Sequence, residues 1–490
     1  MPAALLTVET ARHAACWPNT KPREAGQARA PVVWPAGGCT PTLLATVAWL
    51  VASSAQAEVD PAASVSAVGS VTTTTTGTGT TPSSTAQLTG ELRLHWDGRR
   101  ANANGVLARA QTLLPSVNAS TPNNLLAEAE LRFAKPIQLS GVPVALAAST
   151  LAWQQQTAGG AAASKARFNE LNASAELDFA SITAGKKVLG WDVGYGFRPN
   201  DVVQQELRRN LLAVMPEGRP LIELEHFAGD TAATLVWVNP QRLNTHEANS
   251  RGAGESALAA RFYQRQGAAD WFAFGRLGTH TGASLGAALA WVASDSLELH
   301  ASMRLLQRHD GWATTAGADS RVLASNPWQQ TTLGAANQGL LGAQWTGAQQ
   351  QSLLVEYWHD GNTLSDAQWR AWAQRNLGLM ANPTGLAAPG APASARGGNL
   401  AWQATPFDAV SLRRDNVLLR ASWQPERWTL SFDALIQPAD RGCISTAALQ
   451  WQGERWRFNA SLRHHGGPAS ALVRQLPLRQ QALLAATASF

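Results

Sequence analysis

The chain has 490 residues, of which 45% are hydrophobic and only 15% charged, and its net charge at pH 7 is +5. So small a charge balance gives no reason to expect a nucleic-acid-binding protein. After position 57 no uninterrupted apolar run reaches the roughly 18 residues that a transmembrane helix needs. Tryptophan is abundant, at 20 residues, and it prefers membrane interfaces.

The N-terminal part reads as a leader. An apolar segment at 42–52 precedes Ala55-Gln56-Ala57, which is typical of a signal-peptide core and its cleavage site. We therefore expect a leader over 1–57 and a mature chain that begins at Glu58. The segment before the apolar core is too long for an ordinary signal peptide, so we interpret residues 1–28 as a gene-start extension. A genuine N-terminal domain is the alternative.

Residues 58–87 consist largely of Ser, Thr, Ala and Gly. They contain almost nothing to bury, so we predict a disordered tether. Loss of the leader removes Cys16 and Cys39 and leaves Cys443 alone, so we expect no internal disulfide. The same loss removes four basic and two acidic residues and lowers the net charge to +3.

From residue 88 onward, apolar and polar residues alternate in segments of roughly ten residues. In the first segment Leu92, Leu94 and Trp96 share one face, whereas Arg93 and His95 share the other. A helix would mix these two sets, so the period of two predicts strands. The predicted strands are 88–97, 124–134, 142–154, 167–180, 181–190, 219–228, 231–239, 256–266, 269–278, 282–293, 295–308, 338–346, 350–359, 415–424, 427–437, 443–452, 454–464 and 480–490.

The connections between these strands alternate in length. Most long ones, at 98–123, 191–218, 309–337 and 360–414, follow odd-numbered strands, and brief turns follow even-numbered ones. A soluble sandwich has no reason to segregate its loops in this way. We therefore predict an all-β fold over 88–490, a transmembrane antiparallel β-barrel of about 18 strands (16–18) with short periplasmic turns and long external loops.

The last strand ends on an aromatic residue, Phe490. This ending resembles the C-terminal signature of Gram-negative outer-membrane β-barrel proteins, in which a last strand ending in Phe is read by the assembly machinery. The resemblance implies that the protein resides in the cell outer membrane, with Phe490 as its assembly signal. It also implies outer-membrane lipid and the assembly machinery as partners, but no particular solute.

The most distinctive local sequence runs from Gly185 to Asp201. Its opening, Gly185-Lys186 with Trp191 five residues further on, resembles the Gly-Lys/Arg-x-x-x-x-Trp strand end of large outer-membrane barrels, including alginate-export-like porins. Glycines at 194 and 196 permit tight backbone geometry. We expect a loop that folds into the lumen as a constriction, and a structural corner at the barrel rim is the alternative. The candidate solute-contacting residues are Trp191, Asp192, Tyr195, Arg198 and Asp201.

The longest connection, 360–414, contains a helical segment. Ser365 can cap a helix in which Asp366, Trp369 and Arg370 recur at helical spacing. We expect this helix to lie on the surface, and a plug of the lumen is the alternative.

Charged residues predicted to face the lumen are distributed unevenly. Acidic residues concentrate on the first four strands and arginines on the eighth and ninth. Opposed walls would create a transverse field that orients dipolar solutes, whereas a solvated lumen with local ion pairs is the alternative. The residues are Glu128, Glu130, Glu176, Asp178, Arg261, Arg265 and Arg276.

Enzymatic motifs are lacking. The sequence contains no Gly-x-Ser-x-Gly, no phosphate-binding glycine loop and no His-Glu-x-x-His. We therefore expect no catalytic residues, metal or other cofactor. The function that the sequence favours is a porin-like channel or exporter that passes small hydrophilic solutes by passive diffusion. A homo-oligomer is compatible with this function. The alternatives are a loop-plugged, non-channel barrel that serves an envelope export system as a structural or assembly partner, and an outer-membrane hydrolase.

Overall fold

The computed structural model of the protein describes residues 85–204, 217–240, 254–319, 321–381 and 391–490. The predicted leader over 1–57, the start at Glu58 and nearly all of the predicted tether lie outside the described residues.

Within the described residues, eighteen strands form one antiparallel sheet. Strand β1 pairs with β2 on one side and with β20 on the other, so the sheet closes into a barrel. The strands are β1 (Gln87–Ala101), β2 (Asn124–Leu139), β3 (Val142–Thr157), β4 (Ala162–Glu176), β5 (Ser181–Lys187), β6 (Arg219–Ala228), β7 (Thr231–Val238), β8 (Ala257–Gln266), β9 (Ala269–Gly278), β10 (Gly282–Ser294), β11 (Leu297–Leu306), β14 (Ala336–Thr346), β15 (Gln351–Asp360), β16 (Asp415–Trp423), β17 (Trp428–Gln437), β18 (Gly442–Gln452), β19 (Trp456–Gly466) and β20 (Leu478–Ser489).

The remaining elements lie in the long connections. They are helices α2 (Val106–Leu113), α4 (Asp366–Ala381) and α5 (Ala393–Trp402), the 3₁₀ turns η1 (Thr405–Asp408) and η2 (Leu472–Arg474), and a hairpin of β12 (His309–Thr314) and β13 (Trp328–Leu333). In the described part of the chain, no helix is long and apolar enough to cross a membrane.

The alternating sequence produces two different faces. On β11 the side chains of Met303 and Leu305 are exposed on the outside, whereas Ser302 and Arg304 are buried on the inside. The same alternation leaves large apolar side chains exposed on most of the other strands. An outer surface of this kind fits the hydrocarbon of a membrane.

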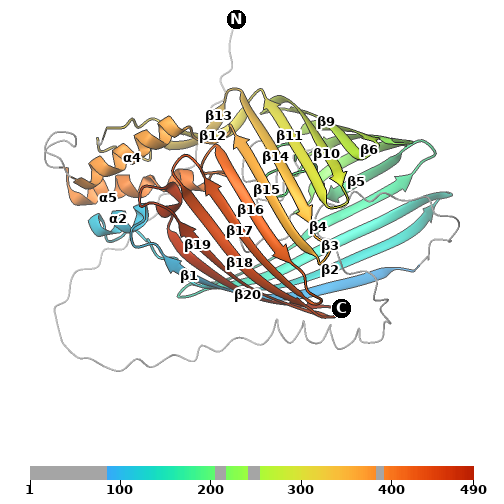
Figure 1. Cartoon of the computed structure of the whole chain (residues 1–490), viewed down its shortest axis with the longest axis horizontal. Coiled ribbons are helices and arrows are strands. Elements are labelled where there is room, and N and C mark those ends of the chain that lie inside the picture. The colour runs from blue at the N-terminus through green and yellow to red at the C-terminus, as the bar shows by residue number, and fades with distance from the viewer. Residues whose placement is uncertain (1–84, 205–216, 241–253, 320, 382–390) are drawn as a thin grey trace, which may run out of the picture. The chain divides into compact units, whose positions relative to one another are not determined.

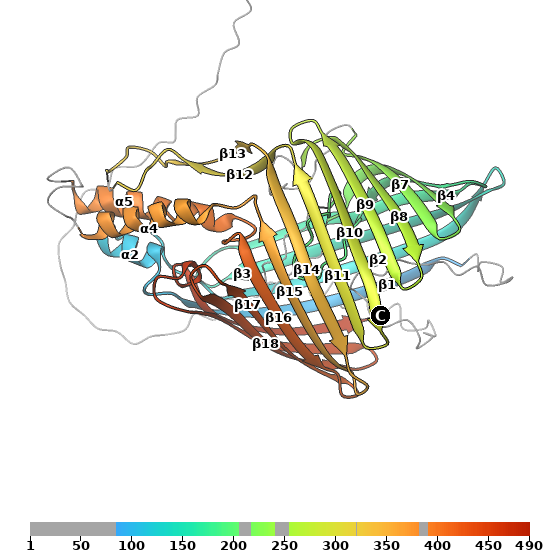
Figure 2. The same ribbon diagram turned by 45° about the horizontal axis from the view of Figure 1, so that its top comes forward.

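The two ends of the barrel differ. Short turns connect the strands at the end where β1 begins and β20 ends, which we call the turn end. The helices and the β12–β13 hairpin belong to the opposite loop end, and Figures 1 and 2 show the helices gathered there, away from the marked C-terminus. The predicted fold and the segregation of loops are thus confirmed.

Some predicted boundaries were wrong. Strand β4 ends at Glu176, because the N–H of Leu177 donates to the carbonyl of Ala180 and closes a turn. Asp178, predicted to face the lumen from this strand, therefore lies in that exposed turn. The β12–β13 hairpin was not predicted and occupies part of a segment that we expected to be a loop.

The closing seam brings the two chain ends together. Gly90 and Phe490 exchange backbone hydrogen bonds of 2.8 and 3.0 Å. A Cβ atom on Gly90 would lie 2.4 Å from the ring of Phe490. The ring therefore covers a glycine on the outer surface of β1, an arrangement that supports the ladder where a glycine weakens it.

Candidate functional site

The distinctive segment after β5 folds into the barrel. Residues 188–204, which we call the inner loop, leave the ladder where the N–H of Val188 donates to the carboxylate of Glu170 at 2.9 Å. Strand β5 therefore ends at Lys187, three residues before its predicted end at 190. The loop then follows the inner wall of the barrel.

Two apolar clusters attach the inner loop to this wall. In the first, Trp191, Val202 and Val203 pack against the inward side chains of β6 to β10, which include Val236 and Phe274. We call this part of the wall the closed side, because the loop covers it. In the second cluster Phe197 stacks on Trp358 at 5.6 Å and contacts the wall at β14 to β17.

A buried carboxylate holds the centre of the loop. Glu356 on β15 is fully buried and accepts hydrogen bonds from the backbone N–H groups of Tyr195 and Gly196, each at 2.7 Å. Its Oε1 also lies 3.0 Å from Nε2 of His300, whose ring contacts that of Tyr195. Hydrogen bonds to a charged acceptor are about twice as strong as neutral ones, so Glu356 is a strong anchor.

A second set of polar contacts closes the loop upon itself. Asp192 has a positive φ of 106° and accepts hydrogen bonds from the N–H of Asn200 at 2.5 Å and from Ser302 Oγ at 2.9 Å. Burial raises the pKa of the Asp192 carboxyl, although these hydrogen bonds oppose the shift. The Asn200 amide donates in turn to Ser302 Oγ and to the carbonyl of Met303 on β11.

Arginines from the wall bind backbone carbonyls of the same loop. Arg304 donates to the carbonyl of Pro199 at 3.1 Å, and Arg276 donates to that of Val202 at 2.5 Å. All of these contacts lie inside the barrel. The inner loop is therefore fixed to the inner wall along its length.

The two central glycines of the loop are required by close approach. A Cβ on Gly194 would lie 2.0 Å from the carbonyl oxygen of Phe197, and one on Gly196 would lie 2.5 Å from a methyl group of Leu418. A larger residue at 194 would clash within the loop, and one at 196 would clash with the wall, so these positions favour glycine for space.

A cavity of about 1450 Å³ runs beside the inner loop. At the turn end it is lined by Gly347, Gln350 and Gln424, and at the loop end by Trp312 and Asp408. The cavity therefore extends along the barrel between its two ends. Much of its lining comes from the inward residues of β14 to β18, which we call the open side.

The five candidate solute-contacting residues have different positions. Tyr195, Arg198 and Asp201 line the cavity. Trp191 is buried against the closed side, where Arg261 lies over its ring, and Asp192 holds the loop together. Burial raises the pKa of Tyr195 to about 12, so its hydroxyl stays neutral at physiological pH.

The predicted lumen charges are compensated locally. Glu128 lies 3.1 Å from His95, and Glu130 is paired with Arg93 and Arg132. On the other strands Arg261 pairs with Glu225 at 3.0 Å and Arg276 with Glu255 at 3.1 Å. Glu176 and Arg265 are exposed near the turn end. Glu128, Glu130, Arg261 and Arg276 thus each have a partner of the opposite charge type nearby.

Charges of both signs remain along the cavity itself. Arg420, Asp433, Thr446 and Arg463 are register partners across β16 to β19 and form one row of lining residues. Arg420 lies 3.5 Å from Asp433, and about half of its side chain is exposed. On the inner loop, Arg198 lines the same cavity.

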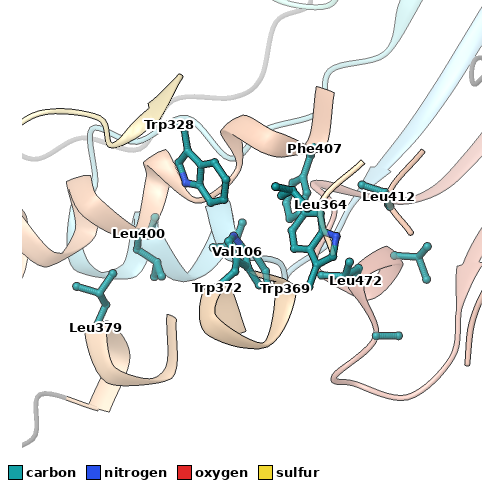
Figure 3. Packing of buried hydrophobic residues seen from close by; sticks show 13 residues of the cluster. Val106, Trp328, Leu364, Trp369, Trp372, Leu379, Leu400, Phe407, Leu412 and Leu472 are labelled. Carbon is teal, nitrogen blue, oxygen red and sulfur yellow. The ribbon is translucent and has the colours of Figure 1, made fainter. Parts of the chain in front are cut away.

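The long connections at the loop end fold together instead of lying on the surface. Trp369 and Trp372 of α4 are buried with Val106 of α2, Trp328 of β13 and Leu472 of η2, as Figure 3 shows. We call this cluster the cap. The helix that we expected in 360–414 is present as α4, but the prediction that it lies on the surface was wrong. Its tryptophans pack against apolar residues from three other connections.

The start of α4 agrees with the sequence pattern. The N–H of Ser365 donates to Oε1 of Gln368 at 2.8 Å, and the N–H of Gln368 donates back to Ser365 Oγ at 3.3 Å. This reciprocal pair is a capping box.

Arg413 connects the cap to the barrel, since it bridges Asp366 at 2.9 Å and Asp440 at 2.7 Å. Leu364 and Leu412 of the cap line the cavity.

Sequence analysis missed the wall residues that hold the loop. Glu356, His300, Ser302 and Arg304 occupy inward positions of predicted strands, so their direction could be read from the alternation. Their partner is a loop more than a hundred residues away, and no local pattern marks that contact. His300, at one of these inward positions, is buried.

No protein-family model and no curated protein matches the chain. Among solved structures it is similar to the Pseudomonas aeruginosa protein OccK5 (OpdH), with a TM-score of 0.47 and 9% identity over 83% of this chain and 98% of that one. It is also similar to a triple mutant of Rhodopseudomonas blastica porin, with a TM-score of 0.40 and 10% identity over 83% of this chain and 100% of that one. The likeness to these solved structures is one of fold, at low sequence identity.

Proposed function

We propose that the protein is an outer-membrane channel through which small hydrophilic solutes diffuse passively, and that the inner loop sets its narrowest section. The observation that carries the proposal is the cavity, which has lining residues at both ends of the barrel and runs beside a loop fixed to the wall. Pore diameter and the groups that line it determine selectivity in such channels.

The outer surface supports a membrane location. Trp345, Trp423, Trp428 and Trp456 lie at the turn-end termini of their strands and are exposed to the outside. Tryptophan rings prefer the membrane interface, and a closed ladder leaves no unpaired strand edge in hydrocarbon. These features favour a membrane-spanning barrel, and the long connections at the loop end favour that end as the one outside the cell.

The cavity also bears on the alternatives. A loop-plugged barrel would need the inner loop or the cap to fill the lumen, but both leave the open side lined by solvent-accessible polar groups such as Ser422 and Gln344. A channel accounts for this lining better than a plugged structural barrel or a hydrolase does.

The test is single-channel recording of the refolded protein and of a Tyr195→Ala/Arg198→Ala variant. The changes remove a ring and a positive charge from the loop surface that faces the cavity, so conductance should rise and anion preference should fall. A Tyr357→Ala/Arg441→Ala variant removes the same residue types from the outer surface and an exposed turn, and should conduct like the parent. Unchanged conductance and selectivity in the loop variant would contradict the constriction.

The location of the protein is tested through its chain ends. We propose that Phe490 is the assembly signal and that the mature chain begins at Glu58. Deletion of Phe490 should reduce the amount of assembled barrel, which resists unfolding and migrates faster unboiled than boiled on a detergent gel, without reducing synthesis. Normal membrane levels of the truncated chain would contradict the proposed signal, and an N-terminal sequence that starts before position 40 would contradict the leader.

A further inference from the structure

A basic cluster lies at the loop end of the closing seam. Arg100 at the end of β1 lies 3.4 Å from the side-chain oxygen of Gln480, whose amide nitrogen lies 3.4 Å from Nδ1 of His464. Arg479 precedes Gln480 in the chain, at the place where the register between β1 and β20 shifts, and it donates to the backbone carbonyl of His465. Arg474 donates to the backbone carbonyl of Gly467 at 3.0 Å, so neither arginine is bound to a carboxylate by these contacts.

The cluster is not neutralised by its own segment. From Trp456 to Phe490 the sequence contains no aspartate or glutamate. The acidic residues of β1 serve other partners, since Glu91 bonds Arg93 and Asp97 bonds Arg99 and Gln481. In the turn between β17 and β18, Asp440 is bound to Arg413. Like charges gathered without a counter-charge favour an anionic partner.

The strand register connects this cluster to the outer apolar surface. Arg100, Gln480 and His464 are register partners across β1, β20 and β19. Two residues further toward the turn end, Ala482 lies between Gly98 and Leu462 in the same way. A Cβ on Gly98 would lie 2.3 Å from the ring of Trp96, so that ring leans toward the basic row.

Beyond this row lies an apolar groove of about 630 Å³. Large side chains line it, with Leu94 and Trp96 on β1, Leu484 on β20, Phe458 on β19 and Trp451 on β18, and Ala460 and Ala486 contribute small side chains among them. Trp96 is four residues from Arg100, which is about 13 Å along a strand. The groove and the basic cluster therefore lie within the span of one lipid molecule.

We propose that the seam of β19, β20 and β1 is a binding site for a phosphate-bearing membrane lipid. The phosphate group would bind Arg100 and Arg479 at the loop end, and an acyl chain would pass over Ala482 into the groove. Arginine forks suit phosphate oxygens, basic pockets beside a membrane bind anionic headgroups, and an acyl chain gains from apolar burial. The site lies outside the lumen and does not depend on solute passage.

The experiment uses the refolded full barrel in detergent and counts retained lipid by native mass spectrometry. Dioleoyl phosphatidic acid is compared with dioleoyl phosphatidylcholine, which has the same chains but no net charge, and with inorganic phosphate as a competitor. The parent should retain phosphatidic acid in preference to phosphatidylcholine. Inorganic phosphate should displace it poorly, since it lacks the chain.

Two kinds of variant separate the headgroup from the chain. Arg100→Gln/Arg479→Gln should weaken retention of phosphatidic acid about tenfold or more, because charge-assisted bonds are lost. Ala460→Trp should fill the groove and weaken retention as well. Ala287→Trp, at an exposed position on β10, is the matched control and should bind like the parent.

Several outcomes would overturn the proposal. These are equal retention of the two lipids by the parent, undiminished retention of phosphatidic acid by the charge variant, and equal effects of Ala460→Trp and Ala287→Trp. Heat-dependent gel mobility shows whether each variant is folded. Should the double variant not fold, Arg100→Gln alone carries the test, because this side chain is exposed and only weakly bonded.

Discussion

The closed and open sides of the barrel wall have the same architecture but opposite inner surfaces. On the closed side, β6 to β10 present inward apolar residues such as Leu221, Val236 and Phe274, which are buried beneath the inner loop. On the open side, β14 to β18 present residues such as Gln344, Ser422 and Asp433, which line the cavity.

This difference shows what places the path through the barrel. An apolar patch inside a water-filled barrel is costly unless something covers it, and the inner loop supplies Trp191 and Val202 for that purpose. The open side is covered only where Phe197 packs on Leu340 and Trp358. The cavity therefore follows the side of the barrel on which polar inward residues remain uncovered.

The largest effect should come from uncovering the closed side. Trp191→Ala removes a buried ring from the first cluster, which typically costs about 3 to 5 kcal/mol. The loop should detach there, so that single-channel conductance rises and becomes noisier. Trp237→Ala on β7 removes an exposed tryptophan from the outer face and should leave conductance unchanged. Equal conductance in both variants would show that the loop is held without this cluster.

The next effect should come from the anchor on β15. Glu356→Gln keeps the shape but removes the charge that binds two backbone N–H groups, and hydrogen bonds to charged groups contribute about 1.5 to 3 kcal/mol each. Hydrogen exchange at Tyr195 and Gly196 should become faster. Asp360, on the same strand, accepts a hydrogen bond from Gln338 and does not contact the loop through it. Asp360→Asn is therefore the control, and it should leave the exchange at Tyr195 and Gly196 slow. Slow exchange in the Glu356 variant would contradict the anchor.

Neighbouring arginine substitutions on β11 sharpen the distinction between wall and loop. Leu299→Arg places a charge in lipid and should cost about 2 to 4 kcal/mol, which lowers the yield of folded barrel. His300→Arg changes a side chain that lies inside the barrel, against Glu356 and Tyr195. It should keep the barrel and disturb the loop, visible as altered conductance with normal gel mobility. A loss of folded barrel with His300→Arg but not with Leu299→Arg would mean that the assigned register is shifted by one residue.

The smallest effect should come from the open side. Arg420→Gln removes a half-exposed charge whose ion pair contributes about 1 kcal/mol or less. Folding should be unchanged, while reversal potentials under a salt gradient should shift toward cations. Arg441→Gln, in an exposed turn, serves as the control. A loss of folded barrel in the Arg420 variant would show that the open side also depends on packing.

The contrast between these regions also explains how far sequence reasoning reached. The strands of the described residues were predicted nearly in full, because inward and outward positions alternate locally and do not depend on distant contacts. Segments such as β11 carry their lipid face and lumen face in their own residues. The hairpin β12–β13 was missed because it packs on the cap and has no long alternating pattern.

The candidate site was predicted only in part. The glycines and aromatic residues of 191–201 indicated an inward loop, but they did not show that Trp191 covers a wall while Tyr195 and Arg198 face the cavity. That assignment depends on side chains of β6 to β15, which the chain brings beside the loop only when the barrel closes.

The sequence by itself determined the closed antiparallel ladder, its two faces and the segregation of long connections, because these follow from a local period of two. Tertiary structure alone decided where the inner loop lies, which inward carboxylate binds it, and that four distant connections form one cap. Those contacts join residues such as Tyr195 and Glu356, whose separation of 161 positions carries no periodic signal. Their geometry exists only once hydrogen bonding between β1 and β20 has closed the barrel around them.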